Sequence, residues 1–180
     1  MLNHRALIKL LDLSTLLAVF FTPLLFFIAT HDQFELPKLT FLTLLLVPFL
    51  THQMLEKTKR RMTPLSLALG AFFLTQAFAS LPGLSLSWRT SLLGDYENFA
   101  GLTTLLAYLL WFWALNRFLN EVRIEKLLLF NSLAALLSSL YAIAQHFQFD
   151  FIQWNPESIN TTREFASMGN PNFLSAYLAI

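Results

Sequence analysis

The chain has 180 residues, of which 56% are hydrophobic and only 13% are charged, and its formal net charge is +1. Its mean hydropathy is +0.55, and soluble domains usually carry about 25% charged residues. This composition excludes a disordered chain, an ordinary soluble enzyme and a nucleic-acid-binding module that relies on basic patches. The sequence has no cysteine, which excludes disulfides, zinc–thiolate sites, iron–sulfur clusters and thiol nucleophiles.

Long apolar stretches follow one another along the chain, and a membrane span needs about 20 such residues. We expect five full spans and the start of a sixth, at about 11–30, 38–55, 64–81, 99–116, 127–147 and 171–180. Because the last stretch is still apolar at Ile180, we expect 1–180 to be the N-terminal part of one larger integral membrane domain. The predicted fold class is all-α, a polytopic transmembrane helix bundle.

Basic residues alternate between the connecting segments. Nine of the twelve fall in segments expected on one side of the membrane: Arg5, Lys9, Lys57, Lys59, Arg60, Arg61, Arg117, Arg123 and Lys126. The other three, Lys38, Arg89 and Arg163, fall in segments expected on the opposite side. The positive-inside rule then predicts a cytoplasmic N-terminus. The first stretch also resembles a secretory signal peptide, but its length and the lack of a cleavage site after Ile28 favour an uncleaved span.

The segment from Arg163 into the last apolar stretch carries the most chemical information. Pro171 suits the first position of a helix, and Asn170 before it suits the cap. Gly169 permits a close backbone approach or a positive φ angle. With Asn172 these residues predict a helix amino end at the outer membrane boundary, which attracts anions. Arg163 adds a guanidinium that matches phosphate oxygens.

These residues together predict a site for a phosphate or diphosphate, with Arg89 of the preceding outer segment as a further cation. The alternative is that the segment only starts a helix and that Arg163 faces water. His146 could face the same site or simply lie at a helix boundary. The four histidines form no ligand motif, so we expect neither a metal nor another cofactor.

The run Gly169-Asn170-Pro171-Asn172, with Arg163 upstream and an apolar helix after it, resembles the O-antigen ligase and polymerase superfamily of bacterial inner-membrane proteins. The stretch from Ser91 to Gly101-Leu102 is similar to an upstream part of the same family. The resemblance covers roughly residues 80–180.

The resemblance implies a metal-independent glycosyltransferase with a GT-C-like fold, truncated here. Such an enzyme moves a glycan from an undecaprenyl-diphosphate carrier to an acceptor on the periplasmic face of the inner membrane. The acceptor would be lipid A–core, a protein hydroxyl or a growing glycan chain. Arg163 matches an arginine thought to hold the diphosphate, and the histidine proposed as the base would lie beyond Ile180.

Two other classes of protein remain open on the sequence. A multi-span transporter would share the spans and an anion site at a helix end, but it should show inverted repeats, which these residues lack. A non-catalytic membrane assembly subunit would need no base. In all three cases the lipid bilayer is an expected partner and nucleic acid is not.

Overall fold

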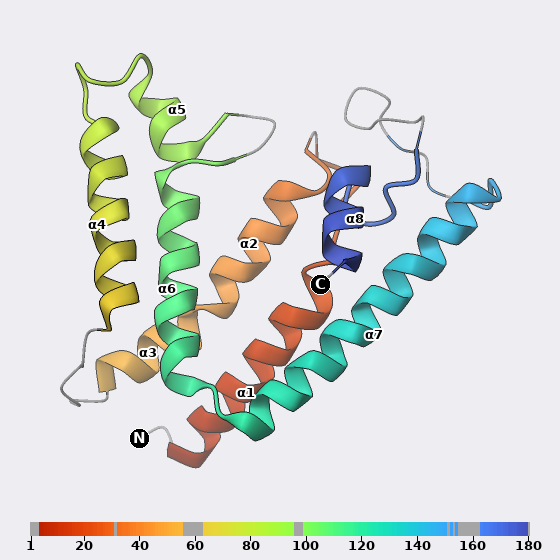
Figure 1. The fold of residues 1–180 in the computed structure, drawn as a ribbon, viewed down its shortest axis with the longest axis horizontal. Coiled ribbons are helices and arrows are strands. Elements are labelled where there is room, and N and C mark those ends of the chain that lie inside the picture. The colour runs from red at the N-terminus through yellow and green to blue at the C-terminus, as the bar shows by residue number, and fades with distance from the viewer. Residues whose placement is uncertain are drawn as a thin grey trace. The chain divides into compact units, whose positions relative to one another are not determined.

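The computed structural model describes residues 4–30, 32–55, 63–95, 99–150, 152, 154 and 163–179. The secondary structure of these residues is helical, apart from an isolated bridge between Pro82 and Ser85 (Figure 1). The chain divides into two compact units. Unit 1 comprises Met1–Leu45 and Asn120–Ile180, and unit 2 comprises Leu46–Leu119.

Unit 1 contains helices from both ends of the chain. They are α1 (His4–Phe21), α2 (Glu35–Leu45), α7 (Glu121–His146) and α8 (Pro171–Leu178). Helix α2 begins where the carboxylate of Asp32 accepts hydrogen bonds from three backbone amides, those of Phe34, Glu35 and Leu36. An acidic residue in this place satisfies orphan amides and complements the positive end of the helix dipole.

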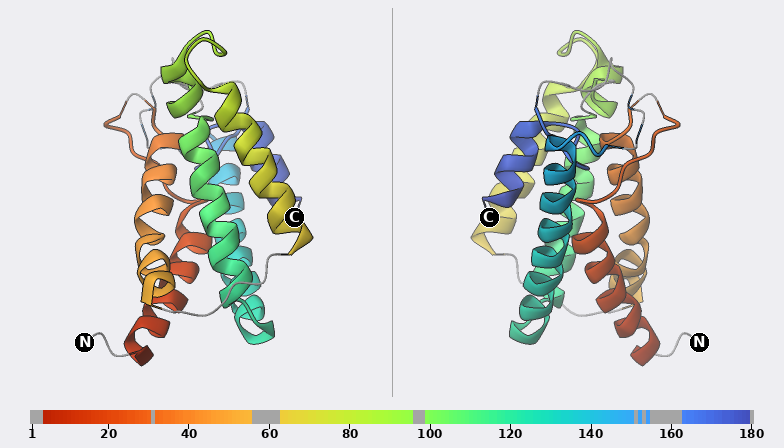
Figure 2. Two further views of the ribbon diagram at one scale, coloured as in Figure 1. Left: turned by 90° about the vertical axis from the view of Figure 1, so that its left-hand side faces the viewer. Right: turned by 90° about the vertical axis from the view of Figure 1, so that its right-hand side faces the viewer.

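Helices α1 and α7 lie side by side and run in the same direction (Figures 1 and 2). Arg123 Nε donates to Asp12 Oδ1 at 2.7 Å near the start of α7. Two turns further along, the rings of Phe20 and Phe130 meet edge to face with centroids 6.0 Å apart. Ser138 of α7 is completely buried. This pairing forms the core of unit 1.

Unit 2 contains α3 (Val47–Leu55), α4 (Pro64–Ala79), α5 (Trp88–Leu93) and α6 (Leu102–Phe118). Helix α4 starts with a cap in which the side chain of Thr63 accepts from the Ser66 amide at 3.1 Å. Helix α6 packs against both α4 and α5. The ring of Phe49 in α3 lies 5.3 Å from that of Trp111 in α6, centroid to centroid.

The expected bundle of five full spans and part of a sixth, with its GT-C-like fold, is wrong for the described structure. Among the described residues, two helical stretches are long and apolar enough to cross a membrane, Glu35–Leu55 and Glu121–His146. Two shorter apolar helices, Pro64–Ala79 and Leu102–Asn116, fall below that length.

The sequence prediction overestimated helix length because apolar runs continue past the helix ends. Helix α1 ends at Phe21, two residues before Pro23, so the apolar residues up to Ile28 do not extend it. Helix α4 has 16 residues, about 24 Å at 1.5 Å per residue, whereas the hydrocarbon core is about 30 Å thick.

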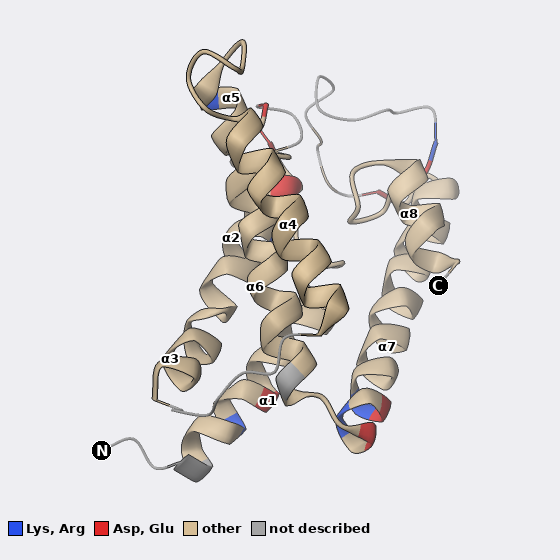
Figure 3. Ribbon diagram, turned by 60° about the vertical axis from the view of Figure 1, so that its left-hand side comes forward, with Lys and Arg blue, Asp and Glu red and all other residues tan. Residues whose placement is uncertain are grey.

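Charged residues of α7 are confined to its first two turns (Figure 3). These are Glu121, Arg123, Glu125 and Lys126. The 20 residues that follow, up to His146, include no Asp, Glu, Lys or Arg. This division gives α7 one polar end and a long apolar body. The orientation of the chain in a membrane stays a prediction.

Candidate functional site

The amino end of α8 has the cap that the sequence predicts. Asn170 has extended backbone angles, φ −142° and ψ 128°, and its Oδ1 accepts from the Asn172 amide at 2.8 Å. Pro171 occupies the first helical position and has no amide hydrogen. The local prediction of a capped helix at Asn170 is therefore confirmed.

Gly169 places this helix end close to α2. Its φ angle is +74°, a region that residues with a side chain rarely adopt. A Cβ atom at Gly169 would lie 2.4 Å from Cδ2 of the Phe34 ring, which is itself buried. Both the backbone angle and the space therefore require glycine here.

A buried cation, Lys38, lies beside the same segment. Only 9% of Lys38 is exposed, and its Nζ lies 3.8 Å from the sulfur of Met168. The ammonium also lies 5.7 Å from the centroid of the Phe34 ring. It forms no ion pair with a described residue. The oxygens of nearby Asp32 are already engaged by the amides at the start of α2.

Sequence reasoning missed Lys38 because it counted the residue only as a charge at the outer end of a span. One sequence signal does point to Lys38. It is a single lysine in the first turn of an otherwise apolar helix whose start is capped by Asp32. Its contact partner, Met168, is 130 residues away in the sequence.

The segment between Arg163 and α8 is anchored by hydrogen bonds from elsewhere in unit 1. Gln145 Oε1 of α7 accepts from the amides of Phe165, at 3.3 Å, and Ala166, at 2.8 Å. The Ser167 hydroxyl donates to the carbonyl of Pro23 at 2.7 Å. Ala166 is completely buried and has a φ angle of +46°. These bonds fix the backbone that leads into α8.

Asp150 forms the centre of a second set of hydrogen bonds, just after α7. Its carboxylate accepts from Tyr141 Oη at 3.0 Å, Gln145 Nε2 at 2.9 Å, Trp154 Nε1 at 2.7 Å and the amide of Ile152 at 3.1 Å. Partial burial alone would raise the pKa of Asp150, but these hydrogen bonds outweigh it and lower the pKa below its usual value.

Trp154, which donates to Asp150, also belongs to a cluster of four aromatic rings. The rings are those of Phe26, Phe34, Trp154 and Phe165. Trp154 stacks on Phe34 with centroids 5.2 Å apart, and it meets Phe165 edge to face at 5.2 Å. Phe26 lies 5.0 Å from Trp154. The cluster joins the segment before α2 to the segment after α7, and it includes the ring that contacts Gly169.

Arg163 itself is exposed, and its guanidinium has no hydrogen bond or ion pair with a described residue. The neighbouring Glu164 contacts His146, and its Oε1 lies 2.7 Å from His146 Nδ1. This bond lowers the pKa of the Glu164 carboxyl. His146 is also the last residue of α7, so the contact with Glu164 leaves both interpretations of His146, a site residue or a residue at a helix boundary, open.

Of the expected site residues, Gly169, Asn170 and Asn172 lie at the amino end of α8, and Arg163 lies exposed in the segment before it, all in unit 1. Arg89 belongs to unit 2, where it is exposed in the first turn of α5. A shared site for Arg89 and Arg163 stays a prediction. The described residues contain no group of three or more His, Cys, Asp or Glu side chains that could hold a metal ion.

A comparison with known proteins matches no family model, no curated protein and no solved structure. The resemblance to the O-antigen ligase superfamily therefore stays a hypothesis that depends on the residues quoted above.

Proposed function

We propose that the chain is a membrane protein that binds a lipid-linked diphosphate through unit 1. In this proposal it is part of a glycosyltransferase that moves a glycan from an undecaprenyl-diphosphate carrier to an acceptor on the periplasmic face of the bacterial inner membrane. The acceptor is a lipid, a protein hydroxyl or a growing glycan. The observation that carries the proposal is the buried ammonium of Lys38 beside Met168 and the amino end of α8.

A buried cation is costly unless an anion or several hydrogen-bond acceptors surround it. The groups in direct contact with the Lys38 ammonium are a thioether sulfur and the face of an aromatic ring, which are weak partners. The carboxylates of Glu35 and Asp32 attract it as well, but neither forms an ion pair with it. A diphosphate would supply the missing acceptor oxygens. It would also complement the positive end of the α8 dipole, since Gly169 brings that end against Phe34.

Arg163 supplies a second cation for the same anion. Its guanidinium has no partner among the described residues, while the adjacent Glu164 is engaged by His146. When the glycosyl bond of a lipid-linked diphosphate breaks, negative charge develops on the leaving diphosphate. Fixed positive groups stabilise this charge most effectively where water is excluded, which applies to the buried Lys38, whereas Arg163 would act from the exposed segment before α8.

The apolar surface of α7 supports a membrane location. Leu128, Leu129, Leu136 and Leu140 are each more than half exposed along this helix. Such a continuous apolar surface is unfavourable in water and favourable in lipid. A lipid-linked substrate has its prenyl chain in the bilayer, so it would approach the protein from the lipid that surrounds α7.

The proposal is tested by binding of farnesyl diphosphate to the purified chain in lipid nanodiscs, with farnesol as the neutral comparison. We expect the diphosphate to bind and farnesol not to bind measurably. Lys38→Met should weaken diphosphate binding about 10- to 100-fold, because one charge-assisted hydrogen bond contributes about 1.5–3 kcal/mol. Arg163→Gln should weaken it in the same range.

Lys9→Met provides the matched control, because Lys9 is an exposed lysine of α1, about 18 Å of helix rise from Phe21, where α1 ends two residues before the Pro23 contact of Ser167. Its affinity should stay within twofold of the wild type. Equal binding of farnesol and farnesyl diphosphate, or equal losses in the Lys38 and Lys9 variants, would contradict the proposal. In native membranes, Arg163→Ala should lower glycan transfer on the order of 100- to 1,000-fold at unchanged protein level.

A further inference from the structure

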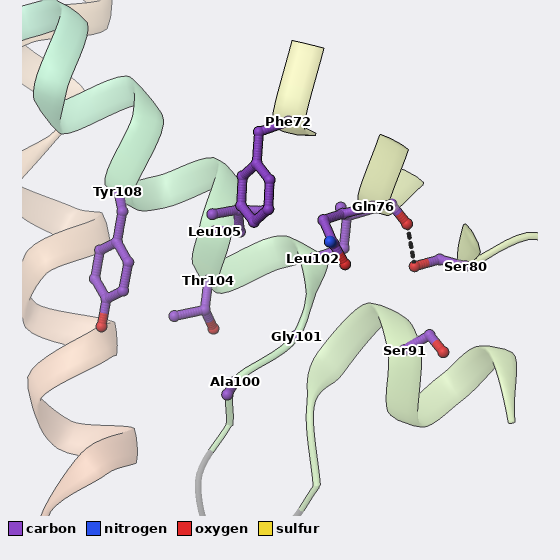
Figure 4. Close-up of a pocket in the computed structure, with 10 residues that line it drawn as sticks. All are labelled: Phe72, Gln76, Ser80, Ser91, Ala100, Gly101, Leu102, Thr104, Leu105 and Tyr108. Atoms are coloured by element: carbon purple, nitrogen blue, oxygen red, sulfur yellow. Dashed lines mark hydrogen bonds between the residues drawn. The ribbon is translucent and has the colours of Figure 1, made fainter. Parts of the chain in front are cut away.

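A pocket of about 320 Å³ lies within unit 2, between α4, α5 and the start of α6 (Figure 4). This volume is at the lower end of the range for small-molecule sites, about 300–1,000 Å³. The side chain of Gln76 extends from α4 toward the start of α6, and the ring of Phe72 lies beside it. The pocket belongs to unit 2 alone, so its argument does not depend on the function proposed for unit 1.

The lining of the pocket combines neutral polar groups with aromatic rings. Its polar groups include the amide of Gln76 and the hydroxyls of Ser91, Thr104 and Tyr108, and no lining residue is charged. The Gln76 side chain and the Ser91 hydroxyl form no hydrogen bond with a described residue. Gln76 is also the largest polar residue of α4, in a helix that is otherwise almost entirely apolar.

One side of the pocket is held in shape by two glycines that let the backbone fold tightly. A Cβ atom at Gly101 would lie 2.2 Å from the amide nitrogen of Gly94 and 2.5 Å from the carbonyl oxygen of Leu92. The hydroxyl of Thr103 donates to the same Leu92 carbonyl at 3.0 Å, and the Thr104 hydroxyl donates to the carbonyl of Phe99. These contacts join α5 to the start of α6 and fix that side of the pocket.

We propose that this pocket binds a neutral polyhydroxylated ligand, namely a sugar ring. A purely apolar ligand would leave the Gln76 amide without a partner and remove its water. A charged ligand would find no counter-charge in the lining. A pyranose has hydroxyls at its edge for Gln76 and Ser91 and apolar C–H faces that pack on Phe72 and Tyr108. Pockets for such ligands combine apolar walls with a few convergent polar groups.

The test uses the purified chain in an amine-oxide detergent, because a maltoside detergent would itself present a sugar. The probe is the methyl glycoside of N-acetylglucosamine, and binding is measured by saturation-transfer NMR and calorimetric titration. Methyl glucuronide tests a charged sugar, and cyclohexanol tests an apolar ring with one hydroxyl. We expect the neutral glycoside to bind at millimolar affinity or better, and both comparison ligands to bind at least fivefold more weakly.

Gln76→Leu keeps the size of the side chain and removes its amide, so it should weaken binding of the glycoside at least fivefold. The matched control is Thr75→Val, since the neighbouring Thr75 hydroxyl donates to the Phe72 carbonyl at 2.7 Å and does not line the pocket. This control should bind within twofold of the wild type. Phe72→Ala should also weaken binding, through loss of the apolar wall.

Three results would overturn the inference. The first is tighter binding of methyl glucuronide or cyclohexanol than of the neutral glycoside. The second is an unchanged affinity for the glycoside in Gln76→Leu. The third is no saturable binding of the glycoside up to about 10 mM, a level near the weak end of specific affinities. Because the probe carries no phosphate, each of these results leaves the proposal for unit 1 unaffected. Failure of farnesyl diphosphate to bind would likewise leave the sugar pocket unaffected.

Discussion

Replacing Gly169 by alanine should destabilise unit 1 strongly, for two separate reasons. The φ angle of +74° places a new side chain in the left-handed region, which costs about 1–2 kcal/mol. The new Cβ would also lie 2.4 Å from the ring of Phe34, and overpacking of this kind costs about 1–3 kcal/mol. The expected loss in free energy of unfolding is therefore about 2–5 kcal/mol.

The assay is thermal unfolding of the purified chain in detergent, followed by circular dichroism. A loss of 1 kcal/mol lowers the Tm of a chain of this size by about 2–4 °C. Gly70→Ala provides the matched control. Gly70 lies inside α4 with nothing within 4 Å of a Cβ atom, so alanine there should raise stability by about 0.5–1 kcal/mol.

A double-mutant cycle separates the two causes of the loss. Phe34→Ala removes the ring that obstructs the new methyl group, so Gly169→Ala should cost about 1–3 kcal/mol less in that background. Additive effects of the two changes, within about 0.5 kcal/mol, would refute the close packing of Gly169 against Phe34. Equal effects of Gly169→Ala and Gly70→Ala would refute the positive φ angle as well.

Two further predictions concern the end of α7. Asp150→Asn should lower stability at neutral pH by about 1–3 kcal/mol, since it weakens charge-assisted hydrogen bonds. The pKa of Asp150 is lowered from its usual 3.8, so its stabilisation is complete above about pH 4 and is lost as the pH falls through the lowered value. Thermal unfolding measured from pH 7 down to pH 2 should show the two proteins converging, and a constant difference would contradict the network. Gln148→Gly should raise stability by up to about 1 kcal/mol. Gln148 has a φ angle of +59° in a helix-ending motif defined by Gln148 N to Gln145 O and Phe149 N to Ala144 O. A lower Tm for this exposed position would contradict that assignment.

The capped start of α8 was predictable from the sequence, and so was the apolar body of α7. Asn170 and Pro171 define a helix start through their own side chains, whatever lies around them. For α7 the predicted stretch began at residue 127, whereas the helix begins at Glu121. Asn120 caps it there, and Glu121 lies in its first turn. A search for uncharged residues finds the apolar part of a helix and misses its polar first turns.

The number of spans and the burial of Lys38 could not be predicted in the same way. Apolar composition does not report where a helix ends, and Pro23 stops α1 within an apolar run. The position of Lys38 depends on the packing of Met168 against α2, between residues 130 positions apart. Arg89 and Arg163 were grouped because both were expected on one side of a membrane, yet the chain places them in different units.

The contacts of the unit 1 site divide into two sets with different tasks. Asp150 and Gln145 hold the segments that follow α7, through hydrogen bonds to Trp154 and to the amides of Phe165 and Ala166. Gly169, in contrast, sets how closely the amino end of α8 approaches Phe34, whose ring also faces the ammonium of Lys38. A side chain at Gly169 would therefore push the helix dipole away from the buried cation, whereas loss of Asp150 would loosen the loop and leave that approach possible. Variants of the two sets therefore separate two versions of the proposed diphosphate binding. If binding depends on the position of α8, Gly169→Ala should weaken it more than Asp150→Asn does, and if it needs only an ordered loop, Asp150→Asn should weaken it more.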